Sequence, residues 1–453
     1  MLIPHRLRLV VLPILLAAAW SAAGGTPQGP AQPATNYDES KVPAYTLPPL
    51  LVKQNGDRVQ RAADWAVRRE EIRLVLESQM FGRAPRETGA VQYSKTDEGP
   101  ALAGQAVRRQ VTITVAGRQL HLLLYLPAKV ARPVPVFVGL GFQPNQSVHR
   151  DPGIRLAGTW VRNSTTQAIE LKPADESTRG AASSRWPVEA ILSRGYGLAT
   201  MYYGDIEPDH DGARSLGIRH GFSKPGQPPP GDDGWGAIAA WAWGLSRIAD
   251  YLNQDKDVDA SRLIVVGHSR LGKAALWAGA QDPRFAIVIS NDSGEGGAAI
   301  SRRRFGETVA DLNTRFPHWF CGKYQQHSGG EDQMPFDAHM LLALAAPRPL
   351  YVASAADDLW ADPKGEFLGA VAASEVYALL GRTGLGTSEM PPPDRPVGDT
   401  VRYHVRTGKH DITLYDWQQF LDFADRHLAT RGRTGPLQDG AGGPVQAPNR
   451  RGW

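Results

Sequence analysis

The sequence has almost no cysteine, which limits both how the fold is stabilised and what chemistry it uses. Cys321 is the single cysteine among 453 residues. One thiol cannot form a disulfide within the chain, so the fold does not depend on such bridges. Cys321 follows an aromatic cluster and has no nucleophile turn around it. We therefore expect it to be a buried packing residue and not a catalytic thiol.

The sequence also lacks an apolar run long enough to span a membrane. The run Leu9–Ala19 is shorter than the ~20 residues that a spanning helix needs. Basic residues precede this run and the small residues Ser21–Ala23 follow it, which is the pattern of a secretory signal peptide. We predict cleavage after Ala23, no stable membrane insertion of the mature protein, and a secreted or periplasmic location.

A basic surface is the third missing feature. The formal net charge is +4, but the signal peptide and the segment after Thr430 together carry more positive charge than this total. The remaining body has a net charge of about −1 and no basic stripe, so the sequence does not predict a nucleic-acid partner.

Composition changes only near the two ends of the chain. Residues 24–45 are rich in Pro, Gly and Thr and predict a flexible leader, and residues 431–453 predict a disordered tail. The Pro-rich stretch Gly221–Gly234 is too short to separate domains and predicts a surface loop. We therefore expect one catalytic domain over residues 46–430, in a monomeric protein.

Strands and helices alternate through this body, which predicts a mostly parallel sheet with helices on both faces, a three-layer α/β fold. Such sheets carry their sites at the carboxyl ends of the strands. The expected strands are Gln110–Val115, Leu120–Leu126, Val134–Gly139, Gly197–Tyr203, Leu263–Val266, Ala286–Ser290, Leu350–Ala353 and Val401–Val405. The long expected helices are Gln60–Met80, Trp235–Asn253 and Tyr415–Leu428.

The stretch Leu263–Ala280 is typical of the nucleophile elbow of α/β-hydrolases. An apolar strand turns through Gly267 and Ser269 into a helix rich in Ala and Leu. Backbone N–H groups at the start of such a helix point to where an oxyanion forms. The usual pattern is G-x-S-x-G, but here Leu271 takes the second glycine position and Gly272 follows it. A serine after glycine is also common in ordinary turns.

The histidine and acid of a serine hydrolase have candidates in the expected order. His410 follows the last strand, in a loop that contains glycine. Asp358 and Asp292 each follow an earlier strand, and either could orient the histidine ring. Their neighbours Asp357 and Glu295 are weaker candidates, since a loop carboxylate often only caps a helix. We expect His268 to pack against or orient the turn, and His339 to be structural.

Several stretches together resemble the glucuronoyl esterases of carbohydrate esterase family 15. The resemblance begins with GHSRLGK around Ser269 and extends over residues 46–427. It includes YYGDIEPD, GWGAIAAWAWGLSRIADYL, SNDSGEGGAAISRRRFGETV, FPHWFC, LALAAPRPLYVASAADDLWADPKGEF and GKHDIT. This family has the α/β-hydrolase fold, so the resemblance implies the same fold here.

The resemblance also implies a substrate and roles for individual side chains. In the family, the arginine that matches Arg270 helps to hold the oxyanion. The lysine that matches Lys273 hydrogen-bonds sugar hydroxyls. Glu307 and Trp360 match residues that contact the uronate ring. Family members place an acid at the Asp358 position, the Asp292 position or both. The implied substrate is the ester that joins glucuronic acid on xylan to lignin alcohols, hydrolysed through an acyl-enzyme on Ser269.

Two other classes of function stay open at this point. One is a carbohydrate esterase of different scope, such as an acetyl xylan esterase. The other is an inactive carbohydrate-binding protein on a hydrolase fold.

We expect no metal and no cofactor in catalysis. Asp205, Glu207, Asp209 and Asp211 alternate like the start of an EF-hand loop, but that loop needs Gly at its sixth and Glu at its twelfth position. This sequence has other residues at both positions.

Overall fold

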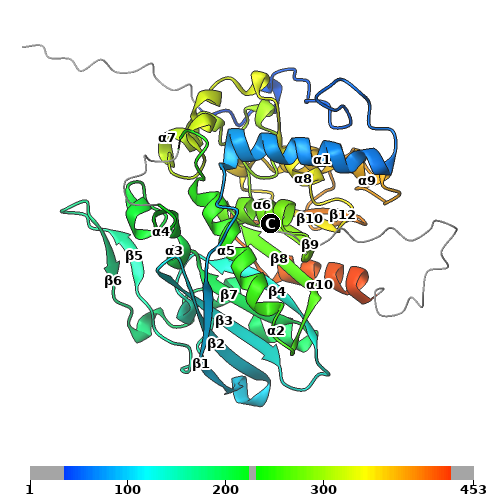
Figure 1. The fold of residues 1–453 in the computed structure, drawn as a ribbon. Helices are drawn as coiled ribbons and strands as arrows, with labels where there is room; N and C mark the ends of the chain where they lie inside the picture. Colours follow the sequence, from blue (N-terminus) through cyan, green and yellow to red (C-terminus); the bar gives the residue numbers. More distant parts are fainter. Residues whose placement is uncertain (1–34, 224–230, 430–453) are drawn as a thin grey trace, which may run out of the picture. The chain divides into compact units, whose positions relative to one another are not determined.

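One ten-stranded sheet forms the centre of the fold (Figure 1). The structure is a computed structural model that describes residues 35–223 and 231–429. The strands lie in the order β1-β2-β3-β7-β4-β8-β9-β10-β12-β11. The strands from β7 to β12 in this order run parallel, and the pairs toward both edges are antiparallel. The predicted α/β fold with a mostly parallel sheet is confirmed.

The strands of this sheet are β1 (Val91–Ala101), β2 (Ala106–Val115), β3 (Arg118–Pro127), β4 (Val134–Gly141), β7 (Gly197–Tyr202), β8 (Val258–His268), β9 (Phe285–Asn291), β10 (Leu350–Ala355), β11 (Val397–Gly398) and β12 (Val401–Arg406). A separate hairpin pairs β5 (Thr159–Arg162) with β6 (Ile169–Lys172). The α-helices are α1 (Ala62–Leu76), α2 (Val188–Ser193), α3 (Tyr203–Ile206), α4 (Ile218–Gly221), α5 (Ala237–Leu252), α6 (Arg270–Gln281), α7 (Val309–Arg315), α8 (Ala338–Ala343), α9 (Pro363–Leu379) and α10 (Leu414–Ala429).

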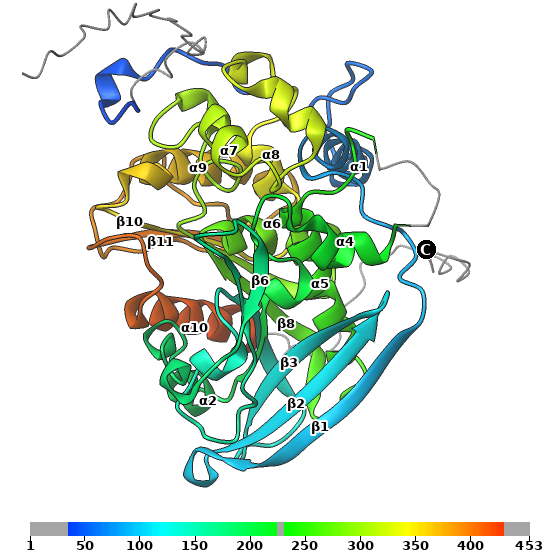
Figure 2. The same cartoon turned by 90° about the vertical axis from the view of Figure 1, so that its left-hand side faces the viewer.

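The sheet has a hydrophobic core on each face because side chains alternate along its buried strands. In β8, Leu263 and Val265 belong to the core that includes α1, α5, α6, α8 and α9. Ile264 and Val266 belong to the opposite core, which includes α2 and α10. Figure 2 shows α2 and α10 on one side of the sheet and α5 on the other. This three-layer arrangement buries β8 on both faces and fixes the position where its last residues emerge.

The antiparallel edge of the sheet extends further than the sequence predicts. β1 pairs with β2 over its whole length, yet most of its residues are partly or fully exposed. Such a strand carries polar residues on both faces and gives no alternating pattern. The expected helix Gln60–Met80 also divides, because α1 ends at Leu76 and a turn of π-helix continues over Glu77–Phe81.

The structure differs from the predicted flexible leader over its last ten residues. The Gly306 N–H donates to the Asn36 carbonyl at 2.8 Å. The ring of Tyr37 meets that of Phe305 edge-on, with centroids 6.2 Å apart. Glu39 lies in a short 3-10 turn and pairs with Lys364 at 2.7 Å. These contacts join the segment to residues more than 260 positions away, which composition alone cannot reveal.

The predicted signal peptide, the first part of the leader, the tail and residues 224–230 of the Pro-rich loop lie outside the described residues. Among the helices that are described, none combines the length and the apolar character needed to cross a membrane.

Candidate active site

Ser269 occupies a sharp turn between β8 and α6. Its φ and ψ are +58° and −132°, a conformation that non-glycine residues rarely adopt and that is typical of functional turns. The Ser269 N–H donates to the Asn291 carbonyl at 2.8 Å, which ties the turn to the neighbouring strand β9. A Cβ atom on Gly267 would lie 2.0 Å from the Leu271 carbonyl oxygen. The first glycine of the elbow is therefore required by the close approach of strand and helix.

Gly272, which comes one residue after the usual second glycine of the elbow pattern, is also required by close packing. A Cβ on Gly272 would lie 3.0 Å from the Ser293 Cβ and 3.2 Å from the Gly267 carbonyl oxygen. Leu271 is itself buried in the core. The elbow thus forms with leucine at the usual glycine position, because the contact with the next loop falls one residue later.

His410 and Asp358 form a short, direct contact. His410 Nδ1–H donates to Asp358 Oδ2 at 2.5 Å. The Asp357 N–H donates to the Gly408 carbonyl at 3.0 Å, so the loops after β10 and β12 are also joined by backbone. Asp358 is buried, whereas the His410 side chain is 40% exposed. Donation from Nδ1 leaves Nε2 of the ring free to accept a proton.

Asp292 lies beside this pair and is held differently. Its Oδ2 accepts from the Asp411 N–H at 3.3 Å and lies 3.6 Å from Arg406 Nη2. Burial, followed by the charges of nearby carboxylates, raises the pKa of Asp292 well above its usual range. The structure therefore brings both predicted acids to the site but gives the direct contact with His410 to Asp358.

One group of side chains among the described residues has the spacing of a metal site. Ligand atoms of His268, Asp292 and His410 lie within 4.8 Å of one another. However, His268 Nδ1 already faces Asn291 Oδ1 at 2.7 Å, and His410 Nδ1 is bonded to Asp358. Each imidazole thus has one nitrogen engaged by a protein oxygen. The His268 and His410 rings pack against each other with centroids 4.5 Å apart.

Arg270 is fixed by a buried carboxylate that the sequence analysis did not select. Arg270 Nη1 donates to Asp209 Oδ2, and its guanidinium lies over the Trp319 ring at 4.7 Å. Asp209 also accepts from Trp319 Nε1 at 2.7 Å, His318 Nε2 at 2.9 Å and the Tyr203 hydroxyl at 3.1 Å. Burial alone would raise the pKa of Asp209, but these donors and the Arg270 charge hold it well below its usual range.

The alternating carboxylates before α4 contact different partners and do not converge. Asp205 accepts from the His121 N–H at 3.3 Å, whereas Glu207 pairs with Arg219 at 2.8 Å in the interior. Asp209 alone among them reaches the candidate active site.

Lys273, one turn further along α6, forms a buried pair with Glu307. Lys273 Nζ lies 3.7 Å from Glu307 Oε2. Burial lowers the pKa of Lys273 and raises that of Glu307, while the attraction between them opposes both shifts. The Glu307 N–H donates to the Trp360 carbonyl at 2.9 Å, which links the two segments. The result is a polar wall beside an aromatic ring.

All eight predicted site residues line one cavity of about 350 Å³. It is bounded by Ser269, Arg270, Lys273, Asp292, Glu307, Asp358, Trp360 and His410, together with Ser293, Gly294, Arg315, Phe316, Trp319 and Ala361. This volume falls within the range of small-molecule sites. The structure thus brings these eight residues together around one cavity.

Three side chains of this cavity were missed as individual site residues. Phe316 and Trp319 stack on each other with centroids 3.9 Å apart. The Arg315 guanidinium lies 5.0 Å from the Trp360 ring centre. They belong to the end of α7 and the loop after it, where no strand end marks a site. The stretch FPHWFC was the available signal, but its aromatics equally suit a core.

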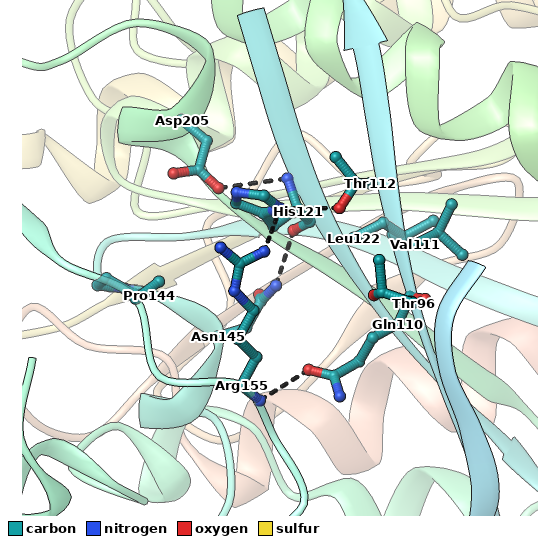
Figure 3. Close-up of a pocket in the computed structure, with 11 residues that line it drawn as sticks. Thr96, Gln110, Val111, Thr112, His121, Leu122, Pro144, Asn145, Arg155 and Asp205 are labelled. Atoms are coloured by element: carbon teal, nitrogen blue, oxygen red, sulfur yellow. Dashed lines mark hydrogen bonds between the residues drawn. The ribbon is translucent and has the colours of Figure 1, made fainter. Parts of the chain in front are cut away.

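A second pocket, between β2, β3 and the Asp205 turn, is too small for a sugar (Figure 3). Its volume is about 20 Å³, enough for about one water molecule. Figure 3 shows His121, Asn145, Arg155 and Asp205 around it. Burial lowers the pKa of His121 to about 4 and raises that of Asp205 to about 7.

The residues expected to be structural have structural contacts. Cys321 is buried, and burial raises the pKa of its thiol. Glu295 accepts from the Ser301 hydroxyl at 2.7 Å and the Tyr324 hydroxyl at 3.1 Å. His339 Nε2 donates to the Pro48 carbonyl at 3.0 Å.

The chain is similar in sequence and in structure to known proteins. Residues 230–381 match a family model described as glucuronyl esterase, fungi. The chain is 47% identical to carbohydrate esterase MZ0003 from an unknown prokaryotic organism, over 87% of this chain and 92% of that protein. It is 27% identical to a 4-O-methyl-glucuronoyl methylesterase of Schizophyllum commune, over 81% of each chain. The solved structure of a Solibacter usitatus glucuronoyl esterase matches with 53% identity and a TM-score of 0.82, covering 86% of this chain and 99% of that one.

Proposed function

Because the chain belongs to the glucuronoyl esterases of carbohydrate esterase family 15 and is a carboxylic ester hydrolase, we propose that it hydrolyses glucuronate esters through an acyl-enzyme on Ser269. The esters are those of glucuronic acid or its 4-O-methyl form, as in links between glucuronoxylan and lignin. The observation that carries the proposal is the single cavity lined by the elbow serine, the His410–Asp358 pair and the polar wall of Lys273 and Glu307.

The first half of the reaction assigns a base and a nucleophile. His410 Nε2 takes the proton from the Ser269 hydroxyl as its oxygen attacks the ester carbonyl. Asp358 accepts from His410 Nδ1–H and stabilises the imidazolium that forms. When the tetrahedral intermediate collapses, His410 returns the proton to the alcohol oxygen and the acyl group stays on Ser269.

The oxyanion has two sources of stabilisation at the start of α6. The first N–H groups of an α-helix have no partner within the helix, and here they follow Ser269 directly. Arg270 adds a fixed positive charge, because Asp209 and the ring of Trp319 hold its guanidinium in place. Water then attacks the acyl-enzyme, with His410 as base, and glucuronate leaves.

The sugar half of the substrate accounts for the remaining polar residues. Glucuronate carries its carboxyl group directly on the ring, so the hydroxyls lie at a fixed position relative to the reacting carbon. Lys273 and Glu307 supply donors and acceptors for hydroxyls, and Trp360 supplies a flat apolar surface for the ring.

A direct test compares two substrates and two inactivated variants. We expect turnover of methyl glucuronate ester at a kcat/KM at least roughly tenfold above that for an acetylated xylose, because the polar wall fits the acid half of the molecule. Ser269→Ala and His410→Ala each remove several orders of magnitude from kcat. Preference for the acetyl ester would favour an acetyl xylan esterase instead. Failure of a fluorophosphonate probe to label Ser269 would favour an inactive binding protein.

Lys273→Ala separates sugar recognition from support of the elbow. We expect the variant to lose at least about tenfold more kcat/KM on methyl glucuronate ester than on an aryl acetate, which lacks the sugar hydroxyls. Kinetics of both substrates with both proteins decide the matter. Equal losses on the two substrates would mean that Lys273 only supports the elbow.

The organisation of the whole precursor is part of the same proposal. Residues 1–23 act as a signal peptide, residues 46–430 form the catalytic domain, and the mature protein is secreted or periplasmic. It works as a monomer without metal, cofactor or nucleic acid. Mass spectrometry of the exported protein tests the cleavage site, which should leave Gly24 as the first residue. A protein retained with its initial residues would contradict export by this route.

A further inference from the structure

Glu307 and Trp360, the residues proposed to contact the sugar, come from two segments that touch each other. The Glu307 N–H donates to the Trp360 carbonyl at 2.9 Å. A Cβ on Gly306 would lie 2.4 Å from the Leu359 carbonyl oxygen and 2.5 Å from that of Trp360. The spacing of the two side chains therefore depends on what holds these two segments together. The N-terminal segment, residues 36–41, contacts both of them.

Glu39 of the N-terminal segment joins the two segments with one carboxylate. Its Oε1 accepts from Arg303 Nη2 at 2.5 Å, and its Oε2 accepts from Lys364 Nζ at 2.7 Å. Arg303 lies four residues before Glu307 in the chain. Lys364 lies four residues after Trp360. Each oxygen of the Glu39 carboxylate is thus bonded to a different segment of the wall that faces the sugar.

Arg303 is the buried centre of this junction. Only 2% of its surface is exposed, and its Nε donates to Asp362 Oδ2 at 2.8 Å. Asp362 in turn accepts from the Gly365 N–H at 2.9 Å and caps the start of α9. A buried guanidinium needs acceptors for its N–H groups. Glu39 supplies one that comes from outside both segments.

Backbone and ring contacts of the N-terminal segment support this bridge. The Gly306 N–H donates to the Asn36 carbonyl at 2.8 Å. The Tyr37 ring packs edge-on against Phe305, with centroids 6.2 Å apart. These contacts fix the backbone that carries Glu39, which reduces the conformational entropy lost when its side chain reaches two partners.

Asp358, although next to this wall in sequence, is held by separate backbone contacts. Its N–H donates to the Ala355 carbonyl at 3.1 Å, and the Asp357 N–H donates to the Gly408 carbonyl at 3.0 Å. These bonds tie the acid to the end of β10 and to the loop after β12. Loss of Glu39 should therefore weaken sugar binding more than it slows bond cleavage.

We infer that Glu39 is a positioning residue for Glu307 and Trp360 and that it sets the affinity for the uronate ring through them. The inference rests on the proposed function, in which Glu307 bonds to ring hydroxyls and Trp360 covers the ring. Without the Glu39 bridge, the two segments lose the acceptor that they share, and the wall that faces the sugar loses its fixed spacing.

The test measures KM and kcat of Glu39→Ala for methyl glucuronate ester and for an aryl acetate, which lacks the sugar. Contacts with ring hydroxyls exist both in the bound substrate and in the transition state, so weakening them raises KM and leaves kcat nearly unchanged. We expect KM for the glucuronate ester to rise about tenfold and both constants for the aryl acetate to stay within about twofold of native. Glu39→Gln, which keeps one acceptor oxygen, should give an intermediate KM.

Glu70→Ala is the matched control. The Glu70 side chain is 52% exposed, close to the 43% of Glu39, and its ion pair with Arg73 at 2.6 Å lies within α1. Its KM values should equal those of the native protein.

Two results with Glu39→Ala would overturn the inference and leave the proposed function standing. One is an unchanged KM for the glucuronate ester, and the other is an equal loss on both substrates, which would mean that Glu39 only stabilises the fold. The same comparison with Glu39→Gln decides the question if Glu39→Ala does not fold. If the native protein hydrolyses no glucuronate ester, the proposed function is wrong and the inference falls with it.

Discussion

Two carboxylates lie within reach of one histidine, but their surroundings differ. Asp358 is largely buried, with 7% of its surface exposed, and accepts a hydrogen bond directly from His410. Asp292 sits in a left-handed conformation with φ +45°, and its Oδ1 has no hydrogen-bond partner. Burial raises the pKa of Asp292 well above its usual range, which favours its neutral form. In the proposed mechanism we therefore expect the larger role for Asp358 and a supporting role for Asp292.

Asparagine substitution at the two acids should have unequal effects. Asp358→Asn removes the acceptor for His410 Nδ1–H, and we expect kcat to fall by about 10²–10⁴. Asp292→Asn should be milder, because a neutral amide resembles the neutral acid that burial favours. The double variant should be worse than either single one. Steady-state kinetics would disprove shared orientation if Asp358→Asn matched Ser269→Ala while Asp292→Asn had no effect.

Asp209 should act on the reaction only through Arg270. Asp209→Asn replaces a carboxylate that accepts from four donors with a group that has one oxygen and an NH₂. We expect kcat to fall by about 10²-fold with little change in KM, as when an oxyanion donor is lost.

The background variant Arg270→Ala is the control for this position. If Asp209 only positions Arg270, adding Asp209→Asn to Arg270→Ala should cause no further fall in kcat. Multiplicative losses in the double variant would show that Asp209 has a separate function. Thermal unfolding of each variant checks that the fold is intact.

Most of the site residues that the sequence predicted are close to a strand end or to the elbow, whereas Glu307 was assigned only by the family resemblance. Ser269, Asp292, Asp358 and His410 follow β8, β9, β10 and β12, and the parallel sheet brings these ends together. Arg315 and Asp209 could not be predicted this way, because they come from connections whose path depends on packing. Asp209 was considered only as one of a row of alternating carboxylates.

At the scale of elements, buried parallel strands were the most predictable part of the fold. β4, β7, β9, β10 and the second half of β8 are mainly apolar runs because both faces are covered. β12 is also largely buried, although Arg402, His404 and Arg406 interrupt its apolar residues. β1 and the β5–β6 hairpin have largely exposed residues, and their pairing depends on partners that no local pattern specifies. The contacts of the N-terminal segment could not be predicted for the same reason, since Tyr37 and Glu39 contact Phe305 and Lys364, which are distant in sequence.

The β8–α6 elbow requires glycine at position 267. Gly267→Ala would place a Cβ 2.0 Å from the Leu271 carbonyl oxygen, which is backbone and cannot move without opening the turn. We expect loss of at least about 10²-fold in kcat/KM, since small displacements of a nucleophile are that costly. Gly99→Ala in β1 is the control, because its Cβ would meet nothing within 4 Å. Native activity in Gly267→Ala would show that the elbow can relax.

At the scale of the whole molecule, the near-balance of charges in the sequence conceals many buried carboxylates. Asp205, Asp292, Glu295 and Glu366 are all carboxyl groups whose pKa burial raises. A buried acid with a raised pKa binds a proton in the folded state at pH values where the unfolded chain has released it. Such groups make the folded protein less stable as pH rises, opposite to the usual effect of paired surface carboxylates.

Asp205 allows this linkage to be tested at one residue. Its pKa is raised to about 7 in the folded protein, compared with about 3.9 in an unfolded chain. Between these values the folded state holds one more proton, so the free energy of unfolding falls as pH rises from about 4 to 7. Asp205→Asn, which keeps an oxygen for the His121 N–H, should therefore stabilise the protein by roughly 2 kcal/mol more at pH 7 than at pH 5. The expected gain in the free energy of unfolding is smaller than the whole pKa shift of Asp205 would give, because the adjoining pocket has room for about one water molecule that can solvate the carboxylate. Urea unfolding at both pH values measures the difference, with Asp211→Asn as the exposed control on the same loop. An equal gain at both pH values would show that the Asp205 carboxyl keeps the same charge in the folded and unfolded states over this range.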